Sequence, residues 1–175
     1  MKKILILALL TLISCDSGNL TNSKAKTIIE TCLEKKPLQR TVQLQINKTR
    51  FYKSQIKELL PKYEKLQEKG LLEIKSLEKN KRKFEVTITE SGKKLIEELR
   101  EGSNFVLMRS HKYEVDEVLE VIENPMQNTA VVKVQYKATD ITPFSILNRS
   151  DMNEFIIQDI KMIKTSNGWK YCDNY

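Results

Sequence analysis

The chain has 175 residues, a formal net charge of +7 and a charged fraction of 30%. With only 5 glycines and 4 prolines, and with no internal repeat or low-complexity stretch, its composition excludes repeat and low-complexity architectures. The excess of lysine and arginine fits three kinds of partner, namely nucleic acid, anionic lipid or an acidic protein.

The N-terminal segment has the parts of an export signal in the right order. Lys2 and Lys3 are basic, residues 4–12 are almost all apolar, and residues 12–15 read Leu-Ile-Ser-Cys. The apolar run is too short to span a bilayer, which takes about 20 residues, but it suits the hydrophobic region of a secretory signal. The Leu-Ile-Ser-Cys ending resembles the lipobox of bacterial lipoproteins. The alternatives are an ordinary signal peptide, or a chance apolar N-terminus that precedes a structural cysteine.

The resemblance to lipoproteins implies a membrane anchor and a location. In that family the cysteine carries a diacylglyceryl group and usually a third acyl chain, such as palmitate, and the peptide before it is removed. Residues 1–14 would then be the signal peptide, Cys15 the lipidated residue, and residues 15–22 a flexible tether. Two or more acyl chains anchor a protein stably. We therefore expect the protein on the inner or outer membrane of the cell envelope, facing the periplasm, where export argues against nucleic acid as the partner.

Cys32 and Cys172 remain as an even pair once Cys15 is lipidated, which predicts a disulfide in an oxidising compartment. For so long a loop, chain entropy alone corresponds to roughly 4–5 kcal/mol of stabilisation. The alternative is a pair of free thiols, as in a cytosolic protein. Two cysteines so far apart do not indicate zinc, and we expect neither a metal nor another cofactor.

Helical spacing dominates the first part of the folded chain. Apolar residues predict a helix over 23–36, and alternation predicts a strand over 41–47. Helical spacing returns over 56–66. Pro61 interrupts it, which predicts a kink or two helices that meet at Leu60.

A hairpin and one more helix are expected next. Gly70 is placed to end the preceding helix. Alternation predicts strands over 71–77 and 83–89, joined by a basic turn. Thr89 can cap a final helix that runs to about Arg100.

Residues 63–99 resemble the second half of a winged-helix domain of the kind found in MarR- and PadR-type transcription regulators. The resemblance rests on Leu-Gln-Glu-Lys-Gly-Leu-Leu at 66–72 and on Phe-Glu-Val-Thr-Ile-Thr-Glu-Ser-Gly-Lys-Lys-Leu at 84–95. It departs from those families at Pro61, where a recognition helix would begin, and in the export signal. It implies a winged-helix-like region over 23–102 whose wing tip carries Lys79, Lys81, Arg82 and Lys83.

The basic wing tip is the candidate contact surface. In a nucleic-acid binder it would contact phosphates. In an exported protein we expect it to contact an acidic partner protein or anionic headgroups, near which each basic residue is worth about 1 kcal/mol. The alternative is a solvated hairpin tip without a partner.

The region 103–175 predicts an antiparallel sheet. Segments 113–122, 129–139 and 154–164 are rich in β-branched and aromatic residues, and Asn167-Gly168 predicts a closing hairpin.

Part of this region also resembles the sheet of small exported proteins with a cystatin- or NTF2-like cone, through residues 130–136 and 168–171. In such a cone, Tyr136 or Trp169 would line an apolar ligand cavity. The alternative is that these residues form core against helices.

The sequence offers no pattern that predicts catalysis. His111 is the single histidine, and its neighbour Ser110 would point to the opposite face of a strand, so we expect a surface histidine. Asp116, Glu117 and Glu120 fit a solvated strand face. Neither a phosphate-binding glycine loop nor a serine-nucleophile elbow occurs.

These observations predict an α+β protein with a winged-helix-like N-terminal half followed by an antiparallel β-sheet half. We expect a membrane-anchored periplasmic lipoprotein that acts as a non-catalytic binding or adaptor module. An envelope protein is the first expected partner and anionic lipid the second. The alternatives are a periplasmic small-ligand binder with a cone-like C-terminal sheet and a winged-helix nucleic-acid binder.

Overall fold

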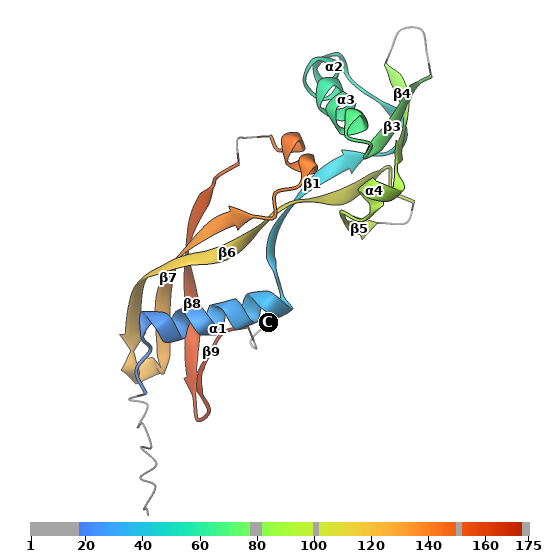
Figure 1. Cartoon of the computed structure of the whole chain (residues 1–175). Coiled ribbons are helices and arrows are strands. Elements are labelled where there is room, and N and C mark those ends of the chain that lie inside the picture. Colours follow the sequence, from blue (N-terminus) through green and yellow to red (C-terminus); the bar gives the residue numbers. More distant parts are fainter. Residues whose placement is uncertain (1–17, 78–81, 100–101, 150–151, 173–175) are drawn as a thin grey trace, which may run out of the picture.

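The computed structural model describes residues 18–77, 82–99, 102–149 and 152–172. The predicted signal peptide and Cys15 lie outside these residues. Strands make up 49% of the described residues and helices 28%. A curled, six-stranded antiparallel sheet forms most of an elongated body, and a three-stranded sheet lies at one end of it (Figure 1).

The described chain begins at the six-stranded sheet, passes through the three-stranded sheet and returns to the six-stranded sheet. The described helices are α1 (Asn22–Lys35), α2 (Lys53–Glu58), α3 (Leu60–Glu68) and α4 (Glu90–Lys93), with 3₁₀ turns η1 (Pro125–Gln127) and η2 (Pro143–Leu147). The described strands are β1 (Leu38–Gln45), β2 (Asn47–Arg50), β3 (Leu72–Ser76), β4 (Lys83–Ile88), β5 (Ile96–Leu99), β6 (Phe105–Asn124), β7 (Thr129–Thr139), β8 (Phe155–Thr165) and β9 (Gly168–Lys170). The sheet orders are β1-β6-β7-β8-β9, with β5 also on β6, and β2-β4-β3.

Strand β6 is 20 residues long and runs through both ends of the body (Figure 1). One of its edges pairs with β1, and the other pairs first with β5 and then with β7. Two backbone hydrogen bonds fill the gap between β5 and β7: the Arg109 N–H donates to the Leu95 carbonyl (2.9 Å), and the Thr142 N–H donates to the Ser110 carbonyl (2.8 Å). The strand is therefore held along both edges where the two parts of the molecule meet.

Helix α1 protects the part of β6 that β1 does not reach. The Asn22 side chain donates to the Val118 carbonyl and the Lys26 ammonium to the Asp116 carbonyl, each at 2.9 Å. An unpaired strand edge is a template for aggregation, and covering it with a helix removes that risk. Thr21 caps the helix, since its hydroxyl accepts from the Lys24 N–H at 3.2 Å.

The first core lies between α1 and the six-stranded sheet. The helix buries Ala25, Ile29 and Cys32, the positions that helical periodicity predicts for its inner face. Opposite them lie the buried residues of β6, β7, β8 and β9: Val115, Val118, Ala130, Val132, Val134, Tyr136, Ile160, Met162 and Trp169.

A second core lies at the other end of the body, where α2 and α3 cover one face of the three-stranded sheet (Figure 1). Pro61 lies in the first turn of α3, which confirms two helices in place of one. The Tyr63 hydroxyl accepts from the Gln45 N–H at 2.8 Å, so α3 is attached to β1. We call the described residues between 46 and 99 the head.

The expected winged-helix N-terminal half is wrong. Helix α1 packs on the six-stranded sheet and not against α2 and α3, so the head lacks the first helix of such a domain. The expected helix from Thr89 to Arg100 ends at Lys93, and β5 follows, with Ile96 opposite Met108 of β6. The protein is mostly β, and its N-terminal half contributes to both sheets.

A close backbone approach explains why α4 needs a glycine at position 92. The Thr89 hydroxyl donates to the Gly70 carbonyl at 2.7 Å and accepts from the Gly92 N–H at 3.2 Å. A Cβ atom on Gly92 would lie 2.4 Å from the Leu71 carbonyl oxygen, inside contact distance. Thr89 and Gly92 thus allow α4 to pack closely against the segment that follows α3.

The predicted disulfide is confirmed. Cys32 and Cys172 are bonded, with Cα atoms 5.8 Å apart and a sequence separation of 140 residues. This Cα distance lies within the usual range. The bond fastens the C-terminal end of the sheet to α1.

Removing the bridge should lower stability without changing the fold. We expect the double substitution Cys32→Ser and Cys172→Ser to reduce the free energy of unfolding by about 2–5 kcal/mol, because the unfolded chain loses a large covalent loop. Urea denaturation measures the change. A reductant should destabilise the original protein and leave the double variant unchanged; equal stability of the two proteins would contradict the role of the bridge.

Candidate functional site

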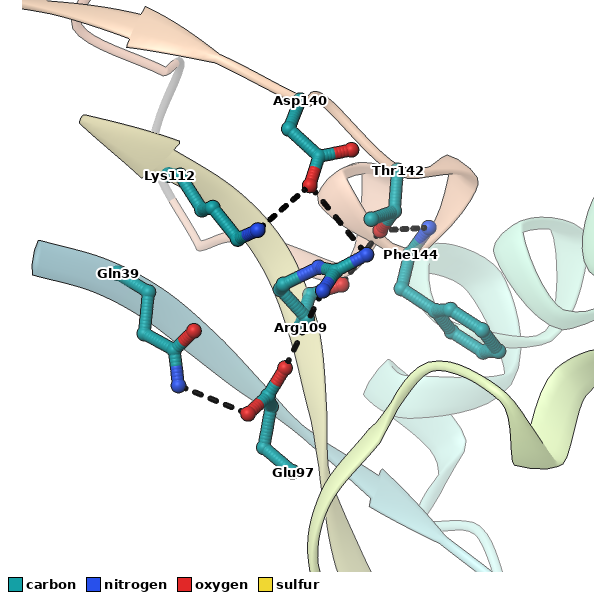
Figure 2. Close-up of polar contacts among 7 residues, drawn as sticks. All are labelled: Gln39, Glu97, Arg109, Lys112, Asp140, Thr142 and Phe144. Atoms are coloured by element: carbon teal, nitrogen blue, oxygen red, sulfur yellow. Dashed lines mark hydrogen bonds and ion pairs between the residues drawn. The ribbon is translucent and has the colours of Figure 1, made fainter. Parts of the chain in front are cut away.

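Polar side chains cluster where the head joins the six-stranded sheet (Figure 2). The Arg109 guanidinium lies 3.7 Å from a Glu97 carboxylate oxygen and 3.4 Å from Asp140 Oδ2. Lys112 Nζ lies 3.2 Å from the same Asp140 oxygen. Gln39 donates to the other oxygen of Glu97 at 2.8 Å. Side chains from β1, β5 and the end of β7 therefore gather around Arg109 and Lys112 of β6.

The arrangement of this cluster favours a structural role. The Thr142 hydroxyl donates to the Arg109 carbonyl and accepts from the Phe144 N–H at 3.2 Å, which holds η2 against β6. The two cations face two carboxylates, so their charges offset one another. A reactive group would need an unpaired charge or space for a substrate. The paired charges here instead hold the head against the six-stranded sheet.

Ser110 and His111 lie at a β-bulge, which overturns the expectation for both residues. Arg40 pairs with His111 and Thr41 with Arg109, so Ser110 is the extra residue. The bulge cancels the normal alternation and brings Ser110 Oγ to 2.9 Å from His111 Nδ1. Both residues are buried, with 0% and 2% of their surface exposed, so the prediction of a surface histidine is wrong.

The Ser110–His111 pair is enclosed. The Asn148 amide donates to Ser110 Oγ at 3.1 Å, and the His111 ring meets the Tyr113 ring edge-on at 4.9 Å. Burial, aided by the positive charge of Arg40, lowers the pKa of His111 below its ordinary value of 6.5. His111 Nε2 is buried and lacks a hydrogen-bond partner among the described residues. A serine needs open space beside it to attack a substrate, and this one is covered.

The buried histidine predicts a specific dependence of stability on pH. Since its folded-state pKa is lowered, the unfolded chain takes up the proton first, and stability falls as the pH drops below about 6.5. Stability is complete above that pH. We expect His111→Asn to flatten the free energy of unfolding between pH 7.5 and 5.5, measured by urea denaturation.

His111 is the only histidine in the chain, and carboxylates titrate at lower pH. Few other groups can therefore make the free energy of unfolding depend on pH in this range. An unchanged slope in His111→Asn would contradict a buried neutral imidazole.

Two hollows lie on either side of the C-terminal end of α1. The first has a volume of about 160 Å³ beside the disulfide, and the second is a shallow groove of about 490 Å³ between α1 and β6. The first is lined by Cys32, Leu33, Lys36, Pro37, Leu38, Tyr136, Gln158, Tyr171 and Cys172. The groove is lined by Glu30, Leu33, Glu34, Pro37, Lys112, Tyr113, Glu114 and Val115.

Of the residues expected to form a cone, some are buried in the first core and one also lines the first hollow. Val132 and Val134 are fully buried in the first core, as the packing alternative predicts. Tyr136 belongs to the same core and also borders the first hollow, and burial raises the pKa of its hydroxyl. Trp169 is buried, and its indole N–H donates to the Gly18 carbonyl at 3.0 Å.

The candidate contact residues lie in the head. Lys79 and Lys81 are outside the described residues, whereas Arg82 and Lys83 are described and exposed at the start of β4. Sequence analysis missed Lys48 and Arg50, which β2 places beside β4, with Arg50 directly opposite Lys83. The alternation of β2 puts them on the same face, but no sequence pattern pairs β2 with β4.

The carboxylates of β6 lie on the exposed sheet surface. Asp116 accepts from the Gln135 amide at 2.7 Å, and Glu120 lies 3.3 Å from Lys133 Nζ. Within the described ranges, no three His, Cys, Asp or Glu side chains are grouped so that they could hold a metal ion. In the same ranges, no helix is both long and apolar enough to cross a bilayer.

A comparison with protein families, curated proteins and solved structures finds no match for this chain. A functional proposal therefore depends on its own residues.

Proposed function

We propose that the protein is an exported lipoprotein, anchored through Cys15 to a bacterial envelope membrane and facing the periplasm, that acts as a non-catalytic binding or adaptor module. The disulfide between Cys32 and Cys172 carries this proposal. Disulfides persist in oxidising compartments and are rare in the cytosol. Together with the lipobox-like segment, the bridge favours export over a cytosolic location.

The position of the first described residues supports an anchored orientation. Gly18 is hydrogen-bonded to Trp169, and Leu20 is buried against the sheet. Three residue steps separate Cys15 from Gly18, a distance of about 10 Å at full extension. The start of α1 would then lie close to the membrane. The head lies at the opposite end of the body, where a partner in the periplasm can reach it (Figure 1).

Intact mass of the membrane-extracted protein tests the anchor. We expect a chain that starts at a lipidated Cys15, with Cys32 and Cys172 labelled by a thiol reagent only after reduction. The substitution Cys15→Ala should give an unlipidated chain, which serves as the matched control. An unprocessed chain with free thiols would contradict both export and the proposed function.

A second candidate function is the binding of a small apolar ligand. The 160 Å³ hollow beside Tyr136 favours it, since a cavity of about this size can hold one aromatic ring. Its lining is mostly apolar, and the Tyr136 hydroxyl, the Gln158 amide and Lys36 are the polar groups that could orient a ligand.

Phenol is a suitable probe for this hollow. We expect phenol to shift NMR signals of residues around Tyr136, and Leu38→Trp to abolish the shifts because the larger side chain fills the space. Leu119→Trp on the exposed sheet surface is the matched control. Shifts that persist in Leu38→Trp would mean that phenol binds elsewhere, and would contradict ligand binding in the hollow.

A further inference from the structure

The outer face of the head's three-stranded sheet gathers basic side chains from three separate segments. Strand register places Lys48, Glu85 and Lys75 in one row, and Arg50 beside Lys83 in the next. The inner face of the same sheet carries the buried residues Phe84, Val86 and Ile88. We name the basic face as the exposed side of this sheet: Lys48, Arg50, Lys75 and Lys83, with the acidic residues Glu73 and Glu85.

The pairing of Arg50 with Lys83 goes against the ordinary preference of a sheet. Like charges directly opposite each other on neighbouring strands are destabilising, and both residues are exposed. Lys48 and Arg50 form no ion pair with another described residue, whereas Lys75 lies 3.9 Å from Glu73. Departures from local rules of this kind concentrate at functional sites.

The net charge of the sequence after residue 14 lies in one segment of the chain. Residues 46–99 hold 14 lysines and arginines against 9 glutamates, whereas residues 15–45 and 100–175 together hold 14 basic and 14 acidic residues. This segment therefore accounts for the entire net charge of +5 that remains without residues 1–14. Its described residues include 12 lysines and arginines and 8 glutamates, and such an excess of positive charge attracts an acidic partner.

We propose that the basic face binds an acidic segment of a partner protein. Its location relative to the membrane rests on the proposed function: the head lies at the far end of the body from the start of α1, so it would point away from the headgroups to which the chain would be anchored (Figure 1). Arg50 supplies a planar fork that matches a carboxylate, and Lys48, two residues along β2 on the same face, adds a point charge. A lipid surface would favour a denser basic cluster beside the anchor.

The test compares two variants of the mature chain that carry the same change in net charge. Lys48→Glu with Arg50→Glu reverses the basic face, and Lys35→Glu with Lys161→Glu reverses two exposed lysines of α1 and β8. The probe is a fluorescein-labelled peptide of 15 residues in which glutamate and threonine alternate. Fluorescence anisotropy at two salt concentrations gives its affinity, and vesicles of phosphatidylcholine and phosphatidylglycerol provide a lipid comparison by flotation.

We expect the reversal on the basic face to weaken peptide binding at least tenfold, and the reversal on α1 and β8 to change it less than twofold. Equal weakening by both variants would mean that net charge alone determines the affinity for the peptide, and this would overturn the proposal. Vesicle binding that depends on Lys48 and Arg50, without peptide binding, would also overturn it in favour of a lipid surface. Because these measurements use unanchored protein, a failure to find lipid on Cys15 would remove the proposed function and leave this result intact.

Discussion

Strand β6 is the constraint on which the rest of the structure depends. Its first part packs against the head and its last part lies under α1, so one continuous backbone spans both cores. A strand of this length must satisfy its N–H and C=O groups along two edges. The chain does this with β1, β5, β7, two single backbone bonds at the joint, and side chains from α1. The polar cluster around Arg109 and the bulge at Ser110 both lie on this strand, where the two parts meet.

Local elements could be predicted because each depends on nearby residues. Helix α1, the interruption at Pro61, the hairpin β3–β4 and the long strands β7 and β8 follow from spacing, proline geometry and alternation. The topology of the head could not be predicted. Strand β2 was not recognised, and the short segment at 96–99 becomes a strand only through pairing with β6. The winged-helix expectation failed for the same reason: local similarity over 63–99 says nothing about where α1 packs.

The candidate site divides in a similar way. The pairing of Cys32 with Cys172 could be predicted from parity and the export signal, and the basic character of 82–83 from composition. The burial of His111 could not be predicted, because a bulge shifts the register and reverses which side chains face inward. The alignment of Arg50 with Lys83 also required the three-dimensional pairing of strands about 30 residues apart.

The bridge between Cys32 and Cys172 also has a topological consequence. It encloses α3, the head and nearly all of the sheet in one covalent ring. A single peptide-bond cut by a protease anywhere inside that ring opens the ring but releases no fragment, because both pieces stay joined through sulfur. After such a cut, release of the head would take either a second cut or reduction of the bridge, so damage to one loop inside the ring does not by itself separate the head from the rest of the protein.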